Sequence, residues 1–455
     1  MEYFKVWLLF VRCIVSYCFL PPKTKYALAG RKLFTKSFRY KNDAGDNVFF
    51  FLKYFLKALL LRQIKVGESV TIYNKGGGVF FYDLEPYTFV GGQKQDNEKF
   101  RLTHINYFSK EKVNGAIWKT RLLGYYSVAD KCMQFIMLTL LFPFLIPFAC
   151  FKKYRASASL LFFEYVELVN LLKIAKRNSV KSLFYYSIYE KDSNISAIAL
   201  QSVNIYVVKV ASLTPLKFWN NIVIADKLVV NTFQQLEETK IFKDTILAKE
   251  IELWGPDENV KVFDRYTLGM YELNKNVIGY YSTASYIRAL ENDLDIYNTS
   301  AGESITMTYI AEYIQKHPGI RLVVFPHPRE KNEKYKKSME EYYARYFKGI
   351  EYKIMLDTQP SAYYFEEANV GIAFYSSVIF ERLYFGFKSM LFTPPDSKVN
   401  VLELRGNKMY ATTKEELFSR LDMFLPMSNH EYFKFVETVS PILNKLTASE
   451  ISASK

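Results

Sequence analysis

The chain contains little cysteine and little histidine, the residues that most often build disulfide frameworks and metal centres. Four cysteines occur in 455 residues, and no two of them form a CxxC pair. Each lies within or beside an apolar run, where a free cysteine behaves as a small hydrophobic residue. The sequence therefore predicts neither a disulfide framework nor a zinc site, which suits a reducing cytosol.

Signatures of phosphate loops and of metal-dependent enzymes are also missing. The three glycines at 76–78 are not followed by Gly-Lys-Ser/Thr, and the alternating aromatics after them favour a β-hairpin over 73–92. The carboxylates nearest to a metal-binding pattern, in the segment ENDLDIY that starts at Glu291, are interpreted as a solvated helix end. We therefore expect no metal and no other cofactor.

Negative charge is scarce in the first third of the chain. Residues 1–155 hold 25 Lys and Arg against 10 Asp and Glu, whereas residues 156–455 hold 35 against 36. No nucleic-acid-binding motif accompanies this basic excess, and the basic residues alternate with long apolar runs. The pattern favours an anionic membrane surface as the partner of the first third, and no nucleic acid.

Long apolar runs are present, and all of the longest fall in this basic third. Residues 132–151 are uncharged and flanked by Lys and Arg, which meets the roughly 18–20 residues needed to span a bilayer. Pro143 and Pro147 predict that this helix is broken, re-entrant or in-plane. The segments 1–23 and 49–65 are further candidates for amphipathic surface helices.

From residue 156 onward, short apolar strands alternate with helical patterns in two successive series. This alternation predicts an α/β fold with two doubly wound, Rossmann-like domains facing a cleft. The expected organisation is a membrane-associating region at 1–155, a first Rossmann-like domain at 156–275, a second at 276–425 and a C-terminal helix at 426–455. Ligands in such sheets bind beyond the carboxyl ends of strands.

Two histidines precede proline, and they are predicted to differ in role. His317 lies in Lys-His-Pro-Gly, a helix-stop pattern in which a solvated C-terminal residue is expected. His327 follows the apolar strand RLVVF and stands between two prolines, which restrict the backbone around it. A stiff loop at a strand end would aim this imidazole and the neighbouring Arg329 at a ligand.

A pair of serines follows a later strand. Ser376 and Ser377 stand between the strand GIAFY and a helix, where serine often serves as an ordinary N-cap. The alternative is that hydroxyls and free N–H groups at the helix start bind a phosphate. Together with His327 at a strand end, the pair favours the phosphate hypothesis.

This His-Pro and Ser-Ser combination resembles bacterial CMP-sugar glycosyltransferases of the GT-B fold, which include sialyltransferases, polysialyltransferases and Kdo transferases. The resemblance covers about residues 276–395. It implies that His327, Ser376 and Ser377 contact the phosphate of CMP. It also implies that the first Rossmann-like domain lies on the acceptor side and the second on the donor side.

Inverting members of that group use an acidic residue as general base. The resemblance places this role on Glu190 and Asp192, although the glycine of the group's motif is missing; Asp257 and Glu258 are substitutes. A structural turn at Glu190 and Asp192 remains an equal alternative. Further candidates for the donor site are Ser282, Thr283, Arg288 and Glu381, the last as a partner of ribose hydroxyls or as a solvated neighbour of Arg382.

The sequence thus predicts a glycosyltransferase that moves an acidic sugar, of sialic acid or Kdo type, from a CMP-activated donor. The expected acceptor is a lipid-linked or surface glycan of a capsule or lipopolysaccharide, at the cytoplasmic face of a bacterial inner membrane. One alternative is a transferase of glycerol phosphate from CDP-glycerol, which the lack of histidine at 156–275 disfavours. Another is a non-catalytic membrane protein on the same fold.

Overall fold

The computed structural model describes most of the α/β part of the chain. The described residues are 2–21, 23–34, 48–59, 69–73, 79–83, 116–119, 128–177, 182–185, 193–211, 216, 222–253, 276–290, 300–357, 361–374, 376–394 and 408–437. The chain divides into two compact units, Met1–Glu258 and Asn259–Lys455. The predicted boundary between the two Rossmann-like domains, at 275–276, adjoins residues 254–275, which lie outside the described residues.

The first unit contains a seven-stranded sheet in the order β3-β1-β2-β4-β5-β6-β7. From β2 to β7 neighbouring strands are parallel, whereas β1 pairs antiparallel with both β2 and β3. The bounds are β1 Ser69–Tyr73, β2 Val79–Asp83, β3 Ala116–Lys119, β4 Ser182–Tyr185, β5 Tyr206–Val210, β6 Val223–Val230 and β7 Ile246–Leu253. The antiparallel β1–β2 pair covers 69–83, and so begins before the predicted hairpin range of 73–92, whose residues after 83 lie outside the described residues.

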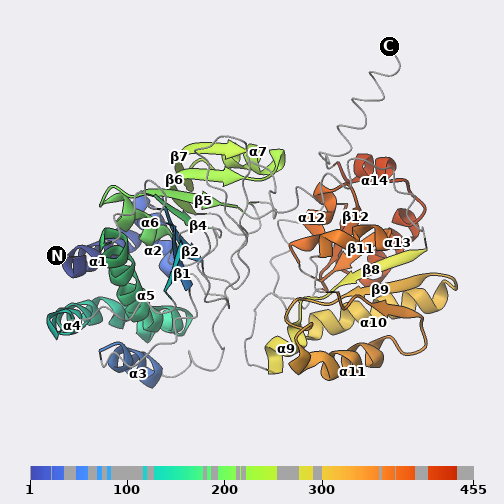
Figure 1. The fold of residues 1–455 in the computed structure, drawn as a ribbon, viewed down its shortest axis with the longest axis horizontal. Helices are drawn as coiled ribbons and strands as arrows, with labels where there is room; N and C mark the ends of the chain where they lie inside the picture. Colours follow the sequence, from blue (N-terminus) through green and yellow to red (C-terminus); the bar gives the residue numbers. More distant parts are fainter. Residues whose placement is uncertain are drawn as a thin grey trace, which may run out of the picture. The chain divides into compact units, whose positions relative to one another are not determined.

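The helices of the basic first third belong to the same unit as this sheet and do not form a separate region. One apolar core joins α1 to α6, with α5 buried along most of its length. The helices are α1 Glu2–Phe19, α2 Lys25–Leu33, α3 Val48–Leu59, α4 Val128–Cys150, α5 Lys152–Arg177, α6 Ser193–Gln201 and α7 Phe233–Ile241. Figure 1 shows α4 between α1 and α3.

The predicted break in the long apolar segment is wrong. The helix α4 runs without interruption through Pro143 and Pro147. Each proline leaves the carbonyl four residues earlier without its helical donor. Both prolines stand on the exposed side of the helix, where such a carbonyl is not enclosed by protein.

The second unit contains a six-stranded parallel sheet in the order β10-β9-β8-β11-β12-β13. Numbered within the unit, this is the 3-2-1-4-5-6 order of dinucleotide-binding folds, with its switch point between β8 and β11. The strands are β8 Val277–Tyr281, β9 Arg321–Phe325, β10 Tyr352–Ile354, β11 Val370–Ala373, β12 Lys388–Phe392 and β13 Tyr410–Ala411. The predicted α/β class with two Rossmann-like sheets is confirmed.

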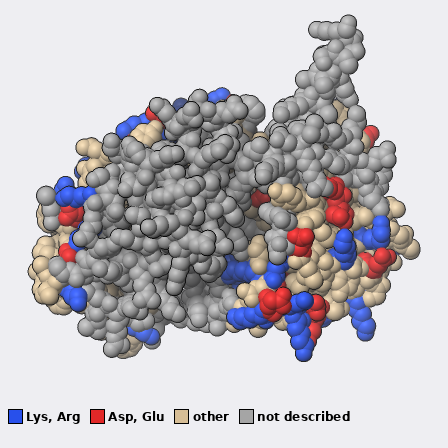
Figure 2. Space-filling view, in the orientation of Figure 1, with Lys and Arg blue, Asp and Glu red and all other residues tan. Residues whose placement is uncertain are grey.

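Helices cover both faces of the second sheet. Figure 1 shows α10 and α11 on one side of it and α12 on the other. The helices are α9 Ser285–Leu290, α10 Ser300–Lys316, η3 Glu333–Tyr335, α11 Lys336–Tyr346, η4 Ser361–Glu367, α12 Val378–Tyr384, α13 Lys414–Phe424 and α14 Asn429–Val436. Lys, Arg, Asp and Glu are interspersed over the described surface of this unit (Figure 2).

Candidate functional site

Three neighbouring strand ends meet at one edge of the second sheet. The register places Tyr281, the last residue of β8, beside Phe325 of β9 and Ala373 of β11. Because all three strands are parallel, the residues that follow them leave the sheet at the same edge. His327 follows β9 and Ser376 follows β11, so the predicted pair flanks the end of β8 at the switch point.

The loop after β9 holds His327 in one tautomer. The backbone N–H of Arg329 donates to Nδ1 of His327 at 3.2 Å. An Nδ1 atom that accepts a hydrogen bond carries no proton, so in the neutral ring the proton lies on Nε2. Burial, followed by the positive charges of Arg288 and Arg329, lowers the pKa of His327 to about 3. The imidazole is therefore neutral near pH 7 and can donate a hydrogen bond through Nε2.

A buried carboxyl group ties the ends of this loop together. Oε2 of Glu330 accepts a hydrogen bond from the backbone N–H of His327 at 2.6 Å, while Tyr343 donates to Oε1 at 2.8 Å. The N–H of Glu330 in turn donates to the carbonyl of His327 at 2.8 Å. Burial, aided by the nearby carboxylate of Glu303, raises the pKa of Glu330 to about 8.

A second buried carboxylate organises the loop after β8. Glu303 of α10 is fully buried and accepts hydrogen bonds from Tyr280 and from the backbone and side chains of the Ser-Thr-Ala-Ser loop. The hydroxyls of Ser282 and Thr283 both donate to Oε1 of Glu303, each at 3.1 Å. These two residues therefore shape the loop with their side chains, and their role in donor binding stays a prediction.

The same loop contains a backbone conformation that is unfavourable for its residue. Ala284 has φ +55° and is fully buried, and a residue with a Cβ rarely adopts this left-handed region. Its N–H donates to the hydroxyl of Ser282 at 3.0 Å. Local strain of this kind persists where surrounding contacts overdetermine it, often at binding sites.

Two guanidinium groups stand near the imidazole. Arg288 of α9 donates from Nε to the carbonyl of Thr283 at 3.3 Å and is partly exposed, as is Arg329. Both lower the pKa of His327 through their charge, which places them near that ring. The ends of β8 and β9 therefore carry two fixed positive charges around one neutral hydrogen-bond donor.

The serine pair opens α12 in an arrangement that differs from ordinary capping. Ser377 occupies the N-cap position with helical angles, and within the described residues its exposed hydroxyl makes no capping hydrogen bond. Ser376, which is partly exposed, accepts from the N–H of Val378 at 3.4 Å. Neither hydroxyl is therefore committed to a strong capping interaction.

The interpretation of Glu381 as one half of a solvated pair with Arg382 is wrong. Arg382 is fully buried, and its guanidinium points into the core, where all five N–H groups have acceptors on Ser389, Tyr281, Phe365, Ala368 and Lys388. Glu381 is half-buried, and desolvation raises the pKa of its carboxyl group to about 7. It stands one turn beyond Ser377, on the helix that follows β11.

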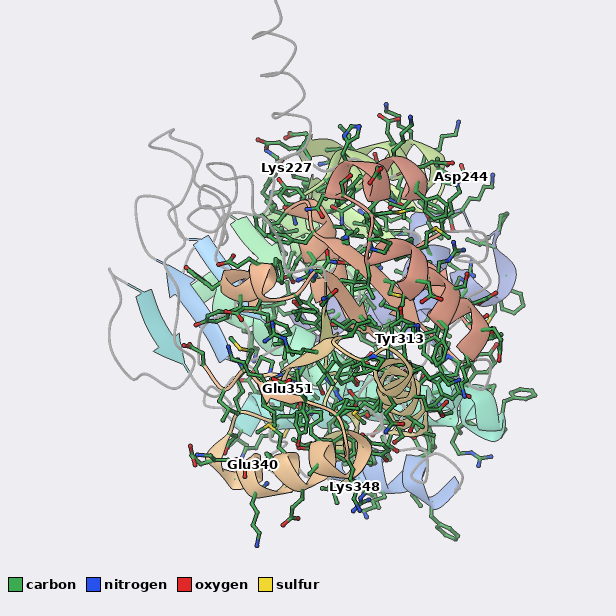
Figure 3. All side chains as sticks on the ribbon, turned by 90° about the vertical axis from the view of Figure 1, so that its right-hand side faces the viewer. Lys227, Asp244, Tyr313, Glu340, Lys348 and Glu351 are labelled. Carbon is green, nitrogen blue, oxygen red and sulfur yellow. The ribbon has the colours of Figure 1, made fainter. Side chains whose placement is uncertain are left out.

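The other predicted residues fall into two groups. Glu190, Asp192, Asp257 and Glu258, the candidates for a general base, lie outside the described residues. His317 directly follows the last residue of α10, as predicted, but it is partly buried rather than solvated. Its ring stacks on Tyr313, labelled in Figure 3, at 4.1 Å between centroids, and its Nδ1 donates to the carbonyl of Tyr313 at 2.8 Å. Among the described residues, no group of three or more His, Cys, Asp or Glu could hold a metal ion.

Comparisons with known proteins give structural likenesses alone. No family model and no curated protein matches the chain. The UDP-GlcNAc 2-epimerase of Neisseria meningitidis, bound to UDP-GlcNAc, matches over 65% of this chain and 81% of its own, with 11% identity and a TM-score of 0.42. MurG of Acinetobacter baumannii matches over 64% and 80%, with 10% identity and a TM-score of 0.35. These values assign no ligand and no reaction to this chain.

Proposed function

We propose that the chain is a metal-independent glycosyltransferase that uses a CMP-activated acidic sugar. The observation that supports this most directly is the position of His327 and Ser376-Ser377 on either side of β8, at the switch point of a 3-2-1-4-5-6 sheet. A nucleotide is the kind of ligand that such an edge holds. The proposed phosphate position lies between the Nε2–H group of His327 and the serine pair.

The chemistry requires stabilisation of a leaving group. An acceptor hydroxyl oxygen attacks the anomeric carbon and its proton passes to a general base, the role proposed for Glu190 or Asp192. The bond from that carbon to the phosphate oxygen breaks, and the phosphate of CMP keeps the electron pair. Preorganised donors aimed at the developing charge stabilise the transition state in such a step. Here the neutral His327 donates a hydrogen bond rather than a proton, and Arg288 and Arg329 supply positive charge.

The remaining groups would bind the nucleotide. The hydroxyls of Ser376 and Ser377 would donate hydrogen bonds to phosphate oxygens. Glu381, one turn into α12, would accept hydrogen bonds from ribose hydroxyls in its ionised form. We propose a lipid-linked or surface glycan as the acceptor, at the cytoplasmic face of a bacterial inner membrane, because the basic apolar first third suits that location.

A donor screen tests the proposal. Calorimetry of the full chain with CMP, CDP and UDP is expected to show the tightest binding for CMP, and transfer assays with CMP-sialic acid, CMP-Kdo, CDP-glycerol and UDP-sugars then identify the donor. His327→Ala is expected to weaken CMP binding and transfer, whereas His317→Ala, at the helix end of α10, is the matched control. Absence of nucleotide binding, or preferred turnover of a UDP-sugar, would contradict the CMP assignment.

A further inference from the structure

The helix α4 is apolar on both of its long sides, because its only charged residues, Asp130 and Lys131, lie in its first turn. Its inner side enters the core of the first unit through Leu138, Leu141 and Leu145, all fully buried. Its outer side is exposed, and all of its residues from 132 to 150 are uncharged: Cys132, Phe135, Ile136, Thr139, Leu140, Pro143, Ile146, Pro147 and Cys150. A helix covered by water on that side would carry polar residues there.

Flanking helices extend this exposed apolar side. The ring of Trp7 on α1 contacts Phe144 of α4 at 6.0 Å between centroids, and Phe55 of α3 contacts Phe142 at 4.4 Å. Both flanking helices also expose large apolar side chains, which are Phe4, Leu8, Val15 and Phe19 on α1 and Phe49, Leu52 and Leu56 on α3. We call the outer sides of α1, α3 and α4 the apolar face. Exposed apolar side chains gathered on neighbouring helices in this way mark interaction sites.

Among the described residues of these three helices, the exposed charged side chains are all positive. The three helices contain two acidic residues, and each is held in an ion pair with α5: Glu2 with Lys176 at 3.0 Å, and Asp130 with Lys173. Their exposed cations are Lys5, Arg12, Lys53 and Lys131. An apolar surface bordered by Lys and Arg complements the boundary between acyl chains and anionic headgroups.

We propose that the apolar face inserts into one leaflet of an anionic bilayer, with α4 lying parallel to the membrane plane. Within the described residues, α4 is the single helix with the length and composition to cross a bilayer. Crossing would withdraw its inner side from the core that it shares with α5. Lying flat keeps that core intact and removes only the exposed outer side from water, as an interfacial helix does.

Vesicle flotation with the full chain tests the surface. The chain is expected to float with vesicles of phosphatidylcholine and phosphatidylglycerol, and much less with phosphatidylcholine alone. Leu140→Glu, at a position that is 48% exposed, is expected to weaken partitioning by about tenfold or more. Ile241→Glu is the matched control, because Ile241 is 73% exposed on α7 of the same unit, outside the apolar face.

The cations that border the apolar face are tested separately. Replacing Lys5, Lys53 and Lys131 together by Gln is expected to weaken binding to anionic vesicles by about a hundredfold.

Native cysteines at the two ends of α4 test its orientation. Cys132 and Cys150 are exposed, and 18 residues of helix separate them by about 27 Å, close to the thickness of the hydrocarbon core. Two variants of the full chain are made, one that retains only Cys132 and one that retains only Cys150, with the other cysteines changed to Ala. A depth-sensitive fluorophore is attached to the remaining cysteine of each. When lipids brominated at a shallow position are confined to the outer leaflet, equal quenching of both labels is expected for a flat helix, whereas a spanning helix would place one label in the unbrominated inner leaflet.

Three results would overturn the proposal. The first is that Leu140→Glu floats as well as the unchanged protein. The second is that, in unlabelled chains, one of the two cysteines reacts with an impermeant thiol reagent added outside the vesicle while the other is protected inside, which would mean that α4 spans. The third is that the protein ignores vesicles and forms a dimer in light scattering that Leu140→Glu dissociates, which would assign the apolar face to a second copy of the chain.

Discussion

The backbone N–H of Arg329 donates to Nδ1 of His327, and this contact determines which ring nitrogen can reach a ligand. Because Nε2 is then the donor, His327→Gln, which places an amide N–H near that position, is expected to keep at least about tenfold more activity than His327→Ala. The alanine variant should lose about a hundredfold in kcat/KM. Steady-state kinetics with the identified donor measures both. Equal losses in the two variants would mean that the Nε2–H group is not used.

The ionisation of His327 gives a second prediction. Its pKa is lowered to about 3, so the ring stays neutral from pH 5 to 8 and contributes no step to the pH dependence of kcat/KM in that range. NMR of the imidazole Cε1 resonance, assigned with the His327→Ala variant, is expected to show no titration between these values. A transition near the ordinary value of 6.5 would show that the ring is hydrated and can act as a charged acid.

The raised pKa of Glu330 predicts that the free energy of unfolding depends on pH. Its pKa is raised from 4.5 to about 8, so the folded state favours the protonated form. The stabilisation is complete below pH 4.5 and decreases as pH rises toward 8, by up to about 1.4 kcal/mol per pH unit. Glu330→Gln keeps an acceptor for the His327 N–H and a partner for Tyr343, and is expected to flatten this slope. If the melting temperature changes with pH by the same amount in both proteins, the pKa of Glu330 is not raised.

Local sequence patterns were sufficient to predict the parallel sheet of the second unit and two of its strand ends. The strand RLVVF and the strand before Ser376 are short buried runs, and their alternation with helices predicts parallel pairing, which places His327 and the serines at one edge. The same patterns could not identify the carboxylates that hold this edge together. Glu303 lies 20 residues from Thr283 along the chain, and it occurs in a helix whose polar residues look solvated.

Burial of charge was the other feature that local sequence could not reveal. Arg382 stands beside Glu381 like half of a surface pair, yet its environment is made by Tyr281, Phe365 and Ser389, which come from three separate elements. Likewise, the strands β1 to β3 come from the basic first third, whose charge suggested a separate membrane region. In each case the deciding contacts join residues that are distant in the sequence.

The packing of Arg382 on β11 gives a prediction about stability. A Cβ at Gly371 would stand 2.6 Å from Cδ of Arg382 and closer still to Nε, and the five hydrogen bonds of the guanidinium prevent it from moving aside. Gly371→Ala is expected to lower the free energy of unfolding by about 1–3 kcal/mol. In the Arg382→Met background no hydrogen bonds hold the flexible side chain in place, so it can move away from the new Cβ, and the two changes should be non-additive in a denaturation cycle. Additive effects would place the cost in the strand backbone instead.

Two serines at helix starts separate structural capping from ligand binding. Ser428 begins α14 with a capping box, in which its hydroxyl accepts from the N–H of Glu431 at 3.2 Å, whereas Ser377 makes no capping bond within the described residues. Ser428→Ala is therefore expected to cost about 1 kcal/mol of stability and to leave nucleotide affinity unchanged. Ser377→Ala is expected to change stability by less than about 0.5 kcal/mol and to weaken CMP binding by about fivefold or more. Thermal melting and calorimetry on both variants measure these effects. If Ser377→Ala lowers stability and leaves CMP affinity unchanged, its hydroxyl serves the helix and not a phosphate.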